Sequence, residues 1–303
     1  MKRNKMLMIF IIIASFFIIK NFCFDKIYSI EDYGSQNVEE VLNYNLYTSF
    51  KKDNIKLDRS DLVTNDGIFP YDINFELEGN GQKFKIISFI DYVPQSFSID
   101  DDEFSMKKNL YIDSSINKKL RFKNKIEGFS ACDLILIPDD IGKNQEAVNR
   151  VHCFTGIINK IEDKNKTKNQ NIRTIKGKNI SGDNNFSFLI NAQYKNEKLV
   201  KNEKIIKCKP KEKINIPVIG NLNNQPNCNY MIFLNDDVVK LNNNKFCNSI
   251  RTTDGNIFCD NVNIISPDKK GRYTLWGLIH YNLYEQDPSN AVSSNNSIIL
   301  NVE

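Results

Sequence analysis

Cysteine is the residue type in this chain whose number and spacing indicate chemistry. After Cys23 no cysteine occurs for more than a hundred residues, and six then follow, at positions 132, 153, 208, 228, 247 and 259. An even number of cysteines in a secreted chain is typical of a disulfide framework. Zinc would be the alternative, but the chain has no Cys-x-x-Cys spacing and only 2 histidines. We therefore predict structural disulfides, no metal site and no other cofactor.

The spacing of the six cysteines favours one connectivity among the many that six thiols allow. Two of them stand apart early in the chain, which suggests a pair in one domain, and the last four form a cluster in the next. Two sheets packed face to face are often stapled by nested bridges, and closing a loop of about 50 residues is worth roughly 4 kcal/mol. The predicted bridges are Cys132–Cys153, Cys208–Cys259 and Cys228–Cys247.

The N-terminus has the features of a secretory signal peptide. Lys2, Arg3 and Lys5 precede an apolar run over residues 6–19, which is too short to span a bilayer comfortably. We predict that residues 1–24 are removed and that the mature chain is secreted. Cleavage is expected close to Cys23, and if this residue is retained, an odd number of cysteines suggests a bond to another chain.

The C-terminus reads as a strand over residues 297–303 and lacks the long apolar tail that a glycosylphosphatidylinositol anchor needs. We therefore expect no direct membrane anchor, and a peripheral position at a cell surface that depends on a partner. The net charge of +4 is spread along the chain, so nothing favours nucleic acid as that partner.

Short alternating runs predict a mostly β protein. Residues 72–78 and 83–87 alternate polar and apolar side chains on either side of Gly79-Asn80-Gly81, a pattern typical of a β-hairpin. One helix is expected over residues 36–45, capped by Ser35. Further runs predict strands at residues 109–112, 133–137, 151–158, 185–190, 204–208, 230–234, 256–259, 262–265 and 273–279.

A polar stretch rich in lysine and asparagine marks the expected domain boundary. It covers residues 164–179, where Ile172 and Ile175 could form a short strand. The mature chain is too long for one small core and suits two domains of ordinary size. We predict two disulfide-stapled β-sandwich domains, over residues 25–163 and 180–303.

The two histidines are the candidates for acid and base chemistry. His152 stands beside Cys153, and a thiolate nucleophile needs a nearby proton acceptor. Adjacent residues on a strand point to opposite faces, so this pair is not expected to be in contact, and we assign no catalytic residue. His280 is expected to be a structural or surface residue.

Acidic residues offer a second kind of site. Residues 100–103, Asp-Asp-Asp-Glu, carry the oxygen ligands that calcium prefers, but they lack the glycine turn of a calcium loop, which favours a solvated loop. Asp236 and Asp237 follow an apolar run and suggest a turn. Trp276, the only tryptophan, lies in a run that is apolar on both faces, which predicts core packing.

Four sequons could carry glycans in a secreted protein. They begin at Asn165, Asn179, Asn185 and Asn295. In a chain this rich in asparagine most sequons are expected by chance, so these residues are candidate sites only.

A secretory signal, a chain rich in Asn and Lys, two β-rich halves and six cysteines that end in a close quartet together resemble the six-cysteine family of surface proteins of malaria parasites and their relatives. The full family domain pairs its cysteines first with second, third with sixth and fourth with fifth, which agrees with the nesting above. The resemblance implies two degenerate domains, the first keeping Cys132 and Cys153 and the second keeping four cysteines.

The resemblance also implies a function. A small, anchorless member of that family is joined by a disulfide to a thrombospondin-related membrane protein of the merozoite and supports invasion of host erythrocytes. By this resemblance we expect a secreted, non-enzymatic, protein-binding scaffold. The alternatives are an adhesin for a ligand such as a glycan on a host or parasite surface, and a secreted hydrolase, which would need a deep pocket around His152 or His280.

Overall fold

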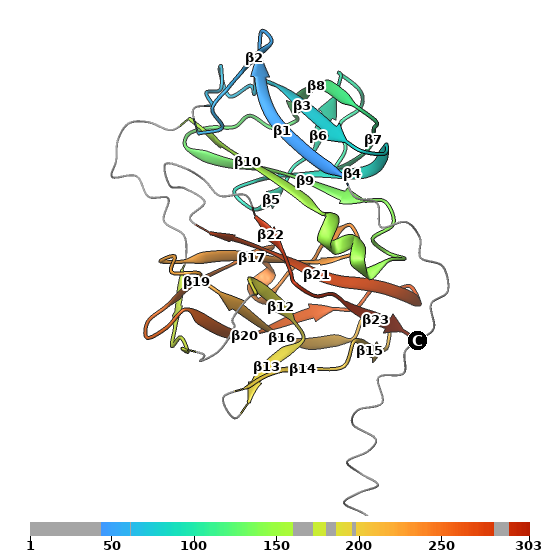
Figure 1. The fold of residues 1–303 in the computed structure, drawn as a ribbon, viewed down its shortest axis with the longest axis vertical. Helices are drawn as coiled ribbons and strands as arrows, with labels where there is room; N and C mark the ends of the chain where they lie inside the picture. Colours follow the sequence, from blue (N-terminus) through green and yellow to red (C-terminus); the bar gives the residue numbers. More distant parts are fainter. Residues whose placement is uncertain (1–43, 61, 160–171, 180–185, 196–197, 282–290) are drawn as a thin grey trace, which may run out of the picture. The chain divides into compact units, whose positions relative to one another are not determined.

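The protein is mostly β, as the alternating runs predict. The structure is a computed structural model that describes residues 44–60, 62–159, 172–179, 186–195, 198–281 and 291–303 (Figure 1). In these residues the helical elements are two 3-10 turns, η1 (Gln145–Arg150) and η2 (Asn242–Asn244). No helix in the described part of the chain is long and apolar enough to cross a membrane.

Ten strands that precede residue 160 form two sheets. Sheet A contains β1 (Asn45–Lys52), β2 (Ile55–Lys56), β3 (Asp72–Glu78), β6 (Phe97–Ile99) and β8 (Ser115–Phe122), in the order β2-β1-β3-β8-β6. Sheet B contains β4 (Gln82–Ile90), β5 (Val93–Pro94), β7 (Lys107–Ile112), β9 (Ser130–Pro138) and β10 (His152–Ile158), in the order β10-β9-β4-β5 with β7 also paired to β4. The apolar faces of the two sheets share one core.

The strands after residue 172 form two further sheets and a ribbon. Sheet C contains β11 (Arg173–Ile175), β15 (Ile205–Cys208), β17 (Cys228–Leu234), β18 (Asp237–Val238), β19 (Asn248–Thr252), β21 (Gly271–Tyr281), β22 (Val292–Ser293) and β23 (Ile298–Val302). Sheet D contains β12 (Phe188–Ile190), β16 (Lys213–Asn221) and β20 (Ile257–Ile265), and the ribbon contains β13 (Ala192–Lys195) and β14 (Lys198–Lys201). Sheets C and D enclose a second core.

A third core lies where sheet B meets sheet C, so that the sheets follow one another in the order A, B, C, D (Figure 1). Phe89 of β4 meets Phe233 of β17, with ring centroids 6.4 Å apart. Trp276 stacks on Phe233 at 4.4 Å and donates its indole N–H to the Asn235 carbonyl oxygen at 2.7 Å. The prediction that Trp276 packs in a core is confirmed. We call this region the shared core.

Ion pairs continue the contact between sheets B and C at one end. The Asp236 carboxylate, in the turn between β17 and β18, lies 3.3 Å from the Lys85 Nζ and 3.0 Å from the Lys107 Nζ. The turn predicted around Asp236 is therefore confirmed. Only 16% of the Asp236 side chain is exposed, against 71% for Asp237, so the first carboxylate carries most of this contact.

The predicted hairpin over residues 72–87 is wrong, although both of its strands form. β3 pairs with β1 and β8 in sheet A, whereas β4 pairs with β7 and β9 in sheet B. β4 is buried on both faces, with Ile86 in the core below sheet A and Ile87 in the shared core. β3 exposes Glu76 on its outer face. Alternation shows that each segment is a strand, but burial on one face or on two decides which sheet it joins.

The predicted helix over residues 36–45 is wrong at its C-terminal end. Asn45 begins β1, whose alternate residues Leu46, Thr48 and Phe50 face sheet B. The earlier residues of that helix, up to residue 43, lie outside the described residues.

The other predicted strands are present with shifted bounds. The runs at residues 256–259 and 262–265 form one strand, β20. The short strand expected near Ile172 and Ile175 is β11, which pairs in parallel with β19. The alternating runs did not reveal three longer strands, β8, β16 and β19.

Candidate functional site

The His152 side chain lies in a groove between the facing edges of sheets A and B. Its Nε2 atom lies 3.2 Å from the Thr48 Oγ1 atom of β1. The groove has a volume of about 340 Å³ and is open to solvent. We call it the edge groove, and it is lined by Leu46, Tyr47, Thr48, Ser49, Lys56, Leu57, Arg59, His152 and Phe154.

The β1–β2 hairpin and the segment after it close one end of the edge groove. Asp53 and Asn54 form the two-residue turn, with φ values of 51° and 64°, which suits the type I′ turns of tight hairpins. The chain then leaves β1 and crosses to β10, where the Arg59 carbonyl oxygen accepts the Ile157 N–H at 2.7 Å. This crossing places the Lys56 and Arg59 side chains beside the groove.

The edge groove also exposes backbone. β3 pairs with β1 along β1's length, but β2 covers the other edge only at Lys51 and Lys52. The Phe50 carbonyl oxygen accepts the Leu57 N–H at 3.0 Å on that same edge. Alternate residues of a strand direct both backbone groups to the same side. Leu46 and Thr48 therefore point their N–H and C=O groups toward the groove, and no described strand pairs with them there.

The electrostatics of the edge groove are one-sided. Lys56 and Arg59 are its permanently charged residues, and no carboxylate or thiol belongs to the described lining. Burial lowers the pKa of His152 below its ordinary value, so this imidazole is neutral at pH 7. The groove thus offers a cation at Lys56, a neutral imidazole, an aromatic ring, two hydroxyls and open backbone.

Cys153 does not reach this site. It points to the opposite face of β10, into the shared core, as the alternation of side chains along a strand requires. Burial raises the pKa of the Cys153 thiol, which keeps it protonated and unreactive. The expectation that His152 and Cys153 form no catalytic pair is consistent with this geometry.

His280 lies in the shared core rather than on the surface. It is 1% exposed, and its Nδ1 atom lies 3.7 Å from the Asp133 Oδ1 atom. The Thr155 hydroxyl donates to the same carboxylate at 2.7 Å, and the Tyr92 ring lies edge-on to the imidazole. Burial raises the pKa of Asp133, while His280 and Thr155 act to lower it. Of the two positions expected for His280, structural or surface, the structure shows the buried one.

The acidic residues 100–103 form a surface loop in which the three aspartates are paired with lysines. Asp100 and Asp101 contact Lys118 and Lys119, at 2.6 and 2.8 Å, and Asp102 contacts Lys108 at 2.8 Å. In the described residues no group of three or more His, Cys, Asp or Glu side chains is arranged to hold a metal ion.

The cysteines lie in the structure as free thiols in the described residues. Cys132 is opposite Gly156, three residues after Cys153, and Cys228 is opposite Ile250, three residues after Cys247. An odd offset puts the two thiols on opposite faces of their sheet. Accordingly, Cys132 and Cys228 enter the cores within their own pairs of sheets, while Cys153 and Cys247 face the shared core.

Cys208 and Cys259 are also apart. The Ser266 hydroxyl donates to the Lys209 carbonyl oxygen at 2.6 Å, so the C-terminal end of β20 lies beside Cys208. Cys259 lies well back along β20, roughly 20 Å away at the usual rise per residue, whereas bridged Cα atoms lie within about 7 Å. The structure brings none of the three predicted pairs together, and the bridges stay predictions. Cys259 is the exposed member of the six.

The sequons are divided between described and undescribed residues. Asn179 and Asn295 are exposed, and the Asn295 Oδ1 atom accepts the Ser187 N–H at 2.7 Å. Asn165 and Asn185 lie outside the described residues.

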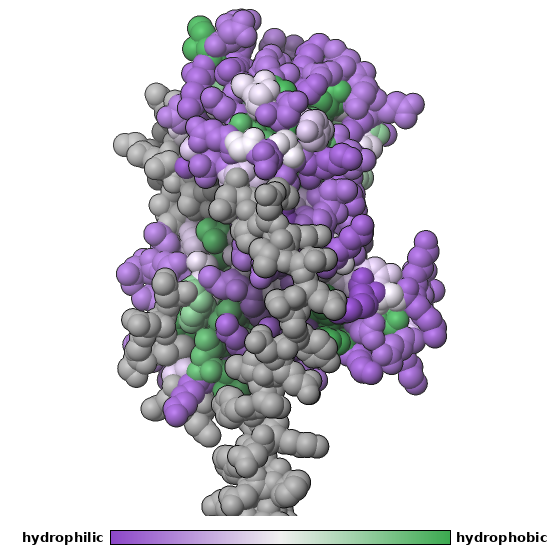
Figure 2. All heavy atoms as spheres, turned by 45° about the vertical axis from the view of Figure 1, so that its right-hand side comes forward, coloured by the Kyte–Doolittle hydropathy of each residue, from purple (hydrophilic) through white to green (hydrophobic). Residues whose placement is uncertain are grey.

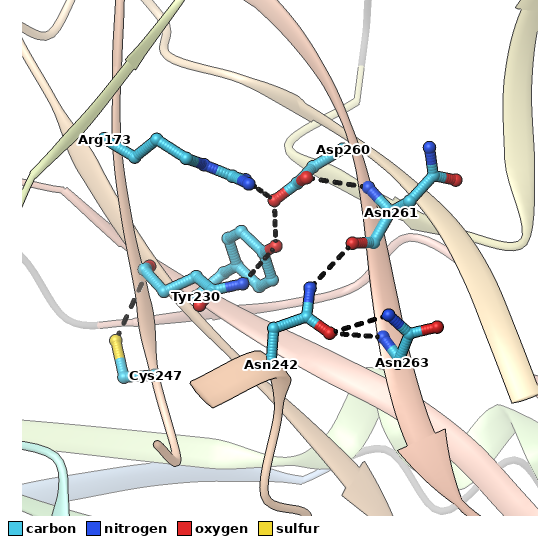
Figure 3. Close-up of polar contacts among 8 residues, drawn as sticks. Arg173, Tyr230, Asn242, Cys247, Asp260, Asn261 and Asn263 are labelled. Carbon is cyan, nitrogen blue, oxygen red and sulfur yellow. Dashed lines mark hydrogen bonds and ion pairs between the residues drawn. The ribbon is translucent and has the colours of Figure 1, made fainter. Parts of the chain in front are cut away.

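A polar cluster that sequence reasoning missed joins sheets C and D (Figure 3). Asp260 of β20 pairs with Arg173 of β11 and accepts the Tyr230 hydroxyl at 2.5 Å. Asn248 donates to that hydroxyl at 2.8 Å, and burial raises the pKa of Tyr230, so the hydroxyl stays protonated. The cluster ties four strands together, β11, β17, β19 and β20. No spacing in the sequence signals it, because its members come from separate strands.

Comparisons with known proteins add little. No family model and no curated protein matches the chain. Among solved structures, one match is a protein of unknown function from Porphyromonas gingivalis W83, with 8% identity over 85% of this chain and 99% of that chain, and a TM-score of 0.23. A likeness at this level carries no argument about fold or function.

Proposed function

We propose that the protein is a secreted, non-enzymatic, protein-binding scaffold, similar in plan to the degenerate two-domain members of the six-cysteine family. The edge groove is the observation that carries the proposal. It combines the exposed ring of Tyr47, the cation of Lys56 and a strand edge that no described strand covers, and such edges are where extended chains bind. Hydrophilic side chains predominate over sheets A and B on the face in Figure 2, which suits a displayed surface.

Binding is better supported than hydrolysis. A hydrolase needs a reactive group within hydrogen-bond reach of its base. His152 lies beside the Thr48 hydroxyl, but the described groove lining contains no carboxylate that could orient the imidazole, and the Cys153 thiol is on the other side of the sheet. His280 is enclosed in the shared core without solvent access.

The partner is proposed to be joined through Cys259, the exposed thiol. The family resemblance suggests a thrombospondin-related membrane protein, which would hold this chain at a parasite surface during erythrocyte invasion. The Cys259 thiolate would attack a disulfide of a secretory-pathway oxidoreductase. A thiolate of the partner would then displace that enzyme, which leaves with both electrons as a dithiol. A bond from Cys259 to the partner would replace the predicted Cys208–Cys259 bridge. The other two predicted bridges are a separate part of the proposal, because joining Cys132 to Cys153 requires β10 to shift along β9.

The test is the tagged full-length chain, recovered from the cells that make it and run on non-reducing and reducing gels. We expect a species of higher mass that reduction converts to the monomer. Cys259→Ser should remove this species, and the matched variant Cys208→Ser should retain it. A chain that stays monomeric both on these gels and by native size-exclusion chromatography would contradict the proposed binding function.

A further inference from the structure

We propose that the edge groove takes an extended, acidic segment of a partner protein, which adds to sheet A as a further strand on β1. The inference rests on the proposed function and names the chemistry of the segment that is bound. It draws on three independent features of the described residues: uncovered backbone, a partly occupied strand edge and a charge of one sign.

The uncovered backbone lies at Leu46 and Thr48. Their N–H and C=O groups point away from β3, because Phe50, two residues further along, uses its carbonyl oxygen on this edge to bind Leu57. The two residues present two donors and two acceptors, about 7 Å apart along the strand. An extended peptide of any sequence repeats its own backbone groups with the same spacing, so the backbone contact supplies affinity without specificity.

The position of β2 defines where the added strand would lie. β2 already occupies this edge of β1 beside Lys51 and Lys52 and then leaves it after Leu57. The incoming segment would fill the vacant part of the edge in line with β2. The crossing segment that ends at Arg59 closes the groove at that end, so the partner chain enters from the side of Tyr44.

The side chains of the edge groove supply the specificity. Alternate residues of an added strand face opposite ways. One set would face the sandwich interior, where Phe154 and Leu46 offer apolar surface. The other set would face outward, where the exposed Lys56 attracts carboxylates and no carboxylate in the described lining opposes them. Glu76 and Glu78 lie on β3, across β1 from the groove. The preferred segment therefore alternates apolar and acidic residues.

A designed peptide tests the inference on the full secreted chain. The probe is a fluorescein-labelled nonapeptide that alternates valine and glutamate. Its controls are the same peptide with lysine in place of glutamate, and the acidic peptide N-methylated at alternate amides. Fluorescence anisotropy should show saturable binding of the probe, at least about tenfold weaker binding of the lysine peptide, and a similar loss for the N-methylated peptide. Equal binding of all three peptides, or none at millimolar concentration, would overturn the inference.

Two pairs of variants locate the contact. Thr48→Pro removes the N–H on the open edge without removing a bond to β3, and should bind the probe about tenfold or more weakly than Thr48→Val, which keeps the N–H. Lys56→Glu should weaken the acidic probe and strengthen the lysine peptide. Lys123→Glu, an exposed change of the same charge away from the groove, should do neither. If Thr48→Pro does not fold, the comparison of Lys56→Glu with Lys123→Glu tests the inference.

Other occupants would give different results. A dimer of this chain that Thr48→Pro dissociates would assign the edge to a second copy and overturn the inference. Failure of the peptide while the reducible complex through Cys259 persists would refute the edge inference and leave the proposed function standing. Peptide binding without any such complex would refute the covalent link and leave the edge site standing.

Discussion

The two histidines of this chain lie in opposite surroundings, although both are strand residues that face another sheet. His152 lies in the open edge groove, against one hydroxyl and beside uncovered backbone. His280 lies in the shared core, between Tyr92 and the Asp133 carboxylate, and is closed to solvent. The shared core holds sheets B and C together, whereas the edge groove is open to another molecule.

Exposure, and not residue type, separates structural polar groups from binding ones in this chain. In the shared core, a polar group without its partner has no water to replace it, so each loss is costly. In the edge groove, water can satisfy whatever a substitution exposes. Substitutions of similar chemistry should therefore have unequal effects on stability in the two regions.

The largest effect is expected at Asp133. Asp133→Ala removes the acceptor of the Thr155 hydroxyl and leaves His280 without its carboxylate inside the shared core. We expect the free energy of unfolding to fall by about 3 kcal/mol, as for other broken buried pairs. Urea denaturation followed by tryptophan fluorescence measures it, because Trp276 reports on the same core. Asp268→Ala, a control at an exposed position, should change it by less than about 0.5 kcal/mol. Equal effects would contradict the comparison.

A smaller effect is expected at the ion pairs between sheets B and C. Asp236→Asn should cost about 1 kcal/mol, because the largely buried carboxylate contacts Lys85 and Lys107. Asp237→Asn, at the exposed neighbouring position, should cost almost nothing.

These ion pairs also have a defined pH dependence. The hydrogen bond and charge of Lys107 hold the pKa of Asp236 below its ordinary value despite the desolvation that opposes them. Its contribution is therefore complete above the unfolded pKa of about 3.9 and is lost as the pH falls through the lower folded value. Acid titration of the two variants against the parent chain measures this. A parent chain and an Asp236→Asn variant with parallel stability curves below about pH 4 would argue against this assignment.

The smallest effect is expected at His152. Burial lowers its pKa, so the unfolded chain takes up a proton first as the pH falls below about 6.5, and stability decreases over that range. His152→Gln should leave stability at pH 7 within about 0.5 kcal/mol of the parent and should flatten this decrease. Thermal melts between pH 7 and pH 5 measure both quantities, and a variant that keeps the full decrease would point to another group.

The sequence predicted the strands better than their arrangement. Short apolar runs located β4, β9, β10, β17 and β21, because the apolar composition of a buried strand is a local property of the sequence. The prediction that β3 and β4 form a hairpin was wrong, because the sheet that a strand joins depends on which of its faces are buried by distant segments. The cysteine spacing suggested pairs, but strand register places Cys132 and Cys153 on opposite faces.

The candidate site was the least predictable part. The contact of Thr48 with His152 joins residues 104 apart in sequence, and that of Asp133 with His280 joins residues on different sheets. No side-chain pattern in the sequence predicts the open edge at Leu46, because the edge is open only where β2 ends. The sequence did predict that the side chains of His152 and Cys153 point to opposite faces of their strand.

Amide hydrogen exchange along β1 in the free, full-length chain shows whether this strand edge is open. We expect an alternation: the N–H groups of Tyr47 and Ser49, which face β3, exchange slowly, while those of Leu46 and Thr48, which face the edge groove, exchange quickly and become protected when the acidic peptide is added. Slow exchange at Leu46 and Thr48 in the free chain would mean that the edge is already covered and is not a binding site.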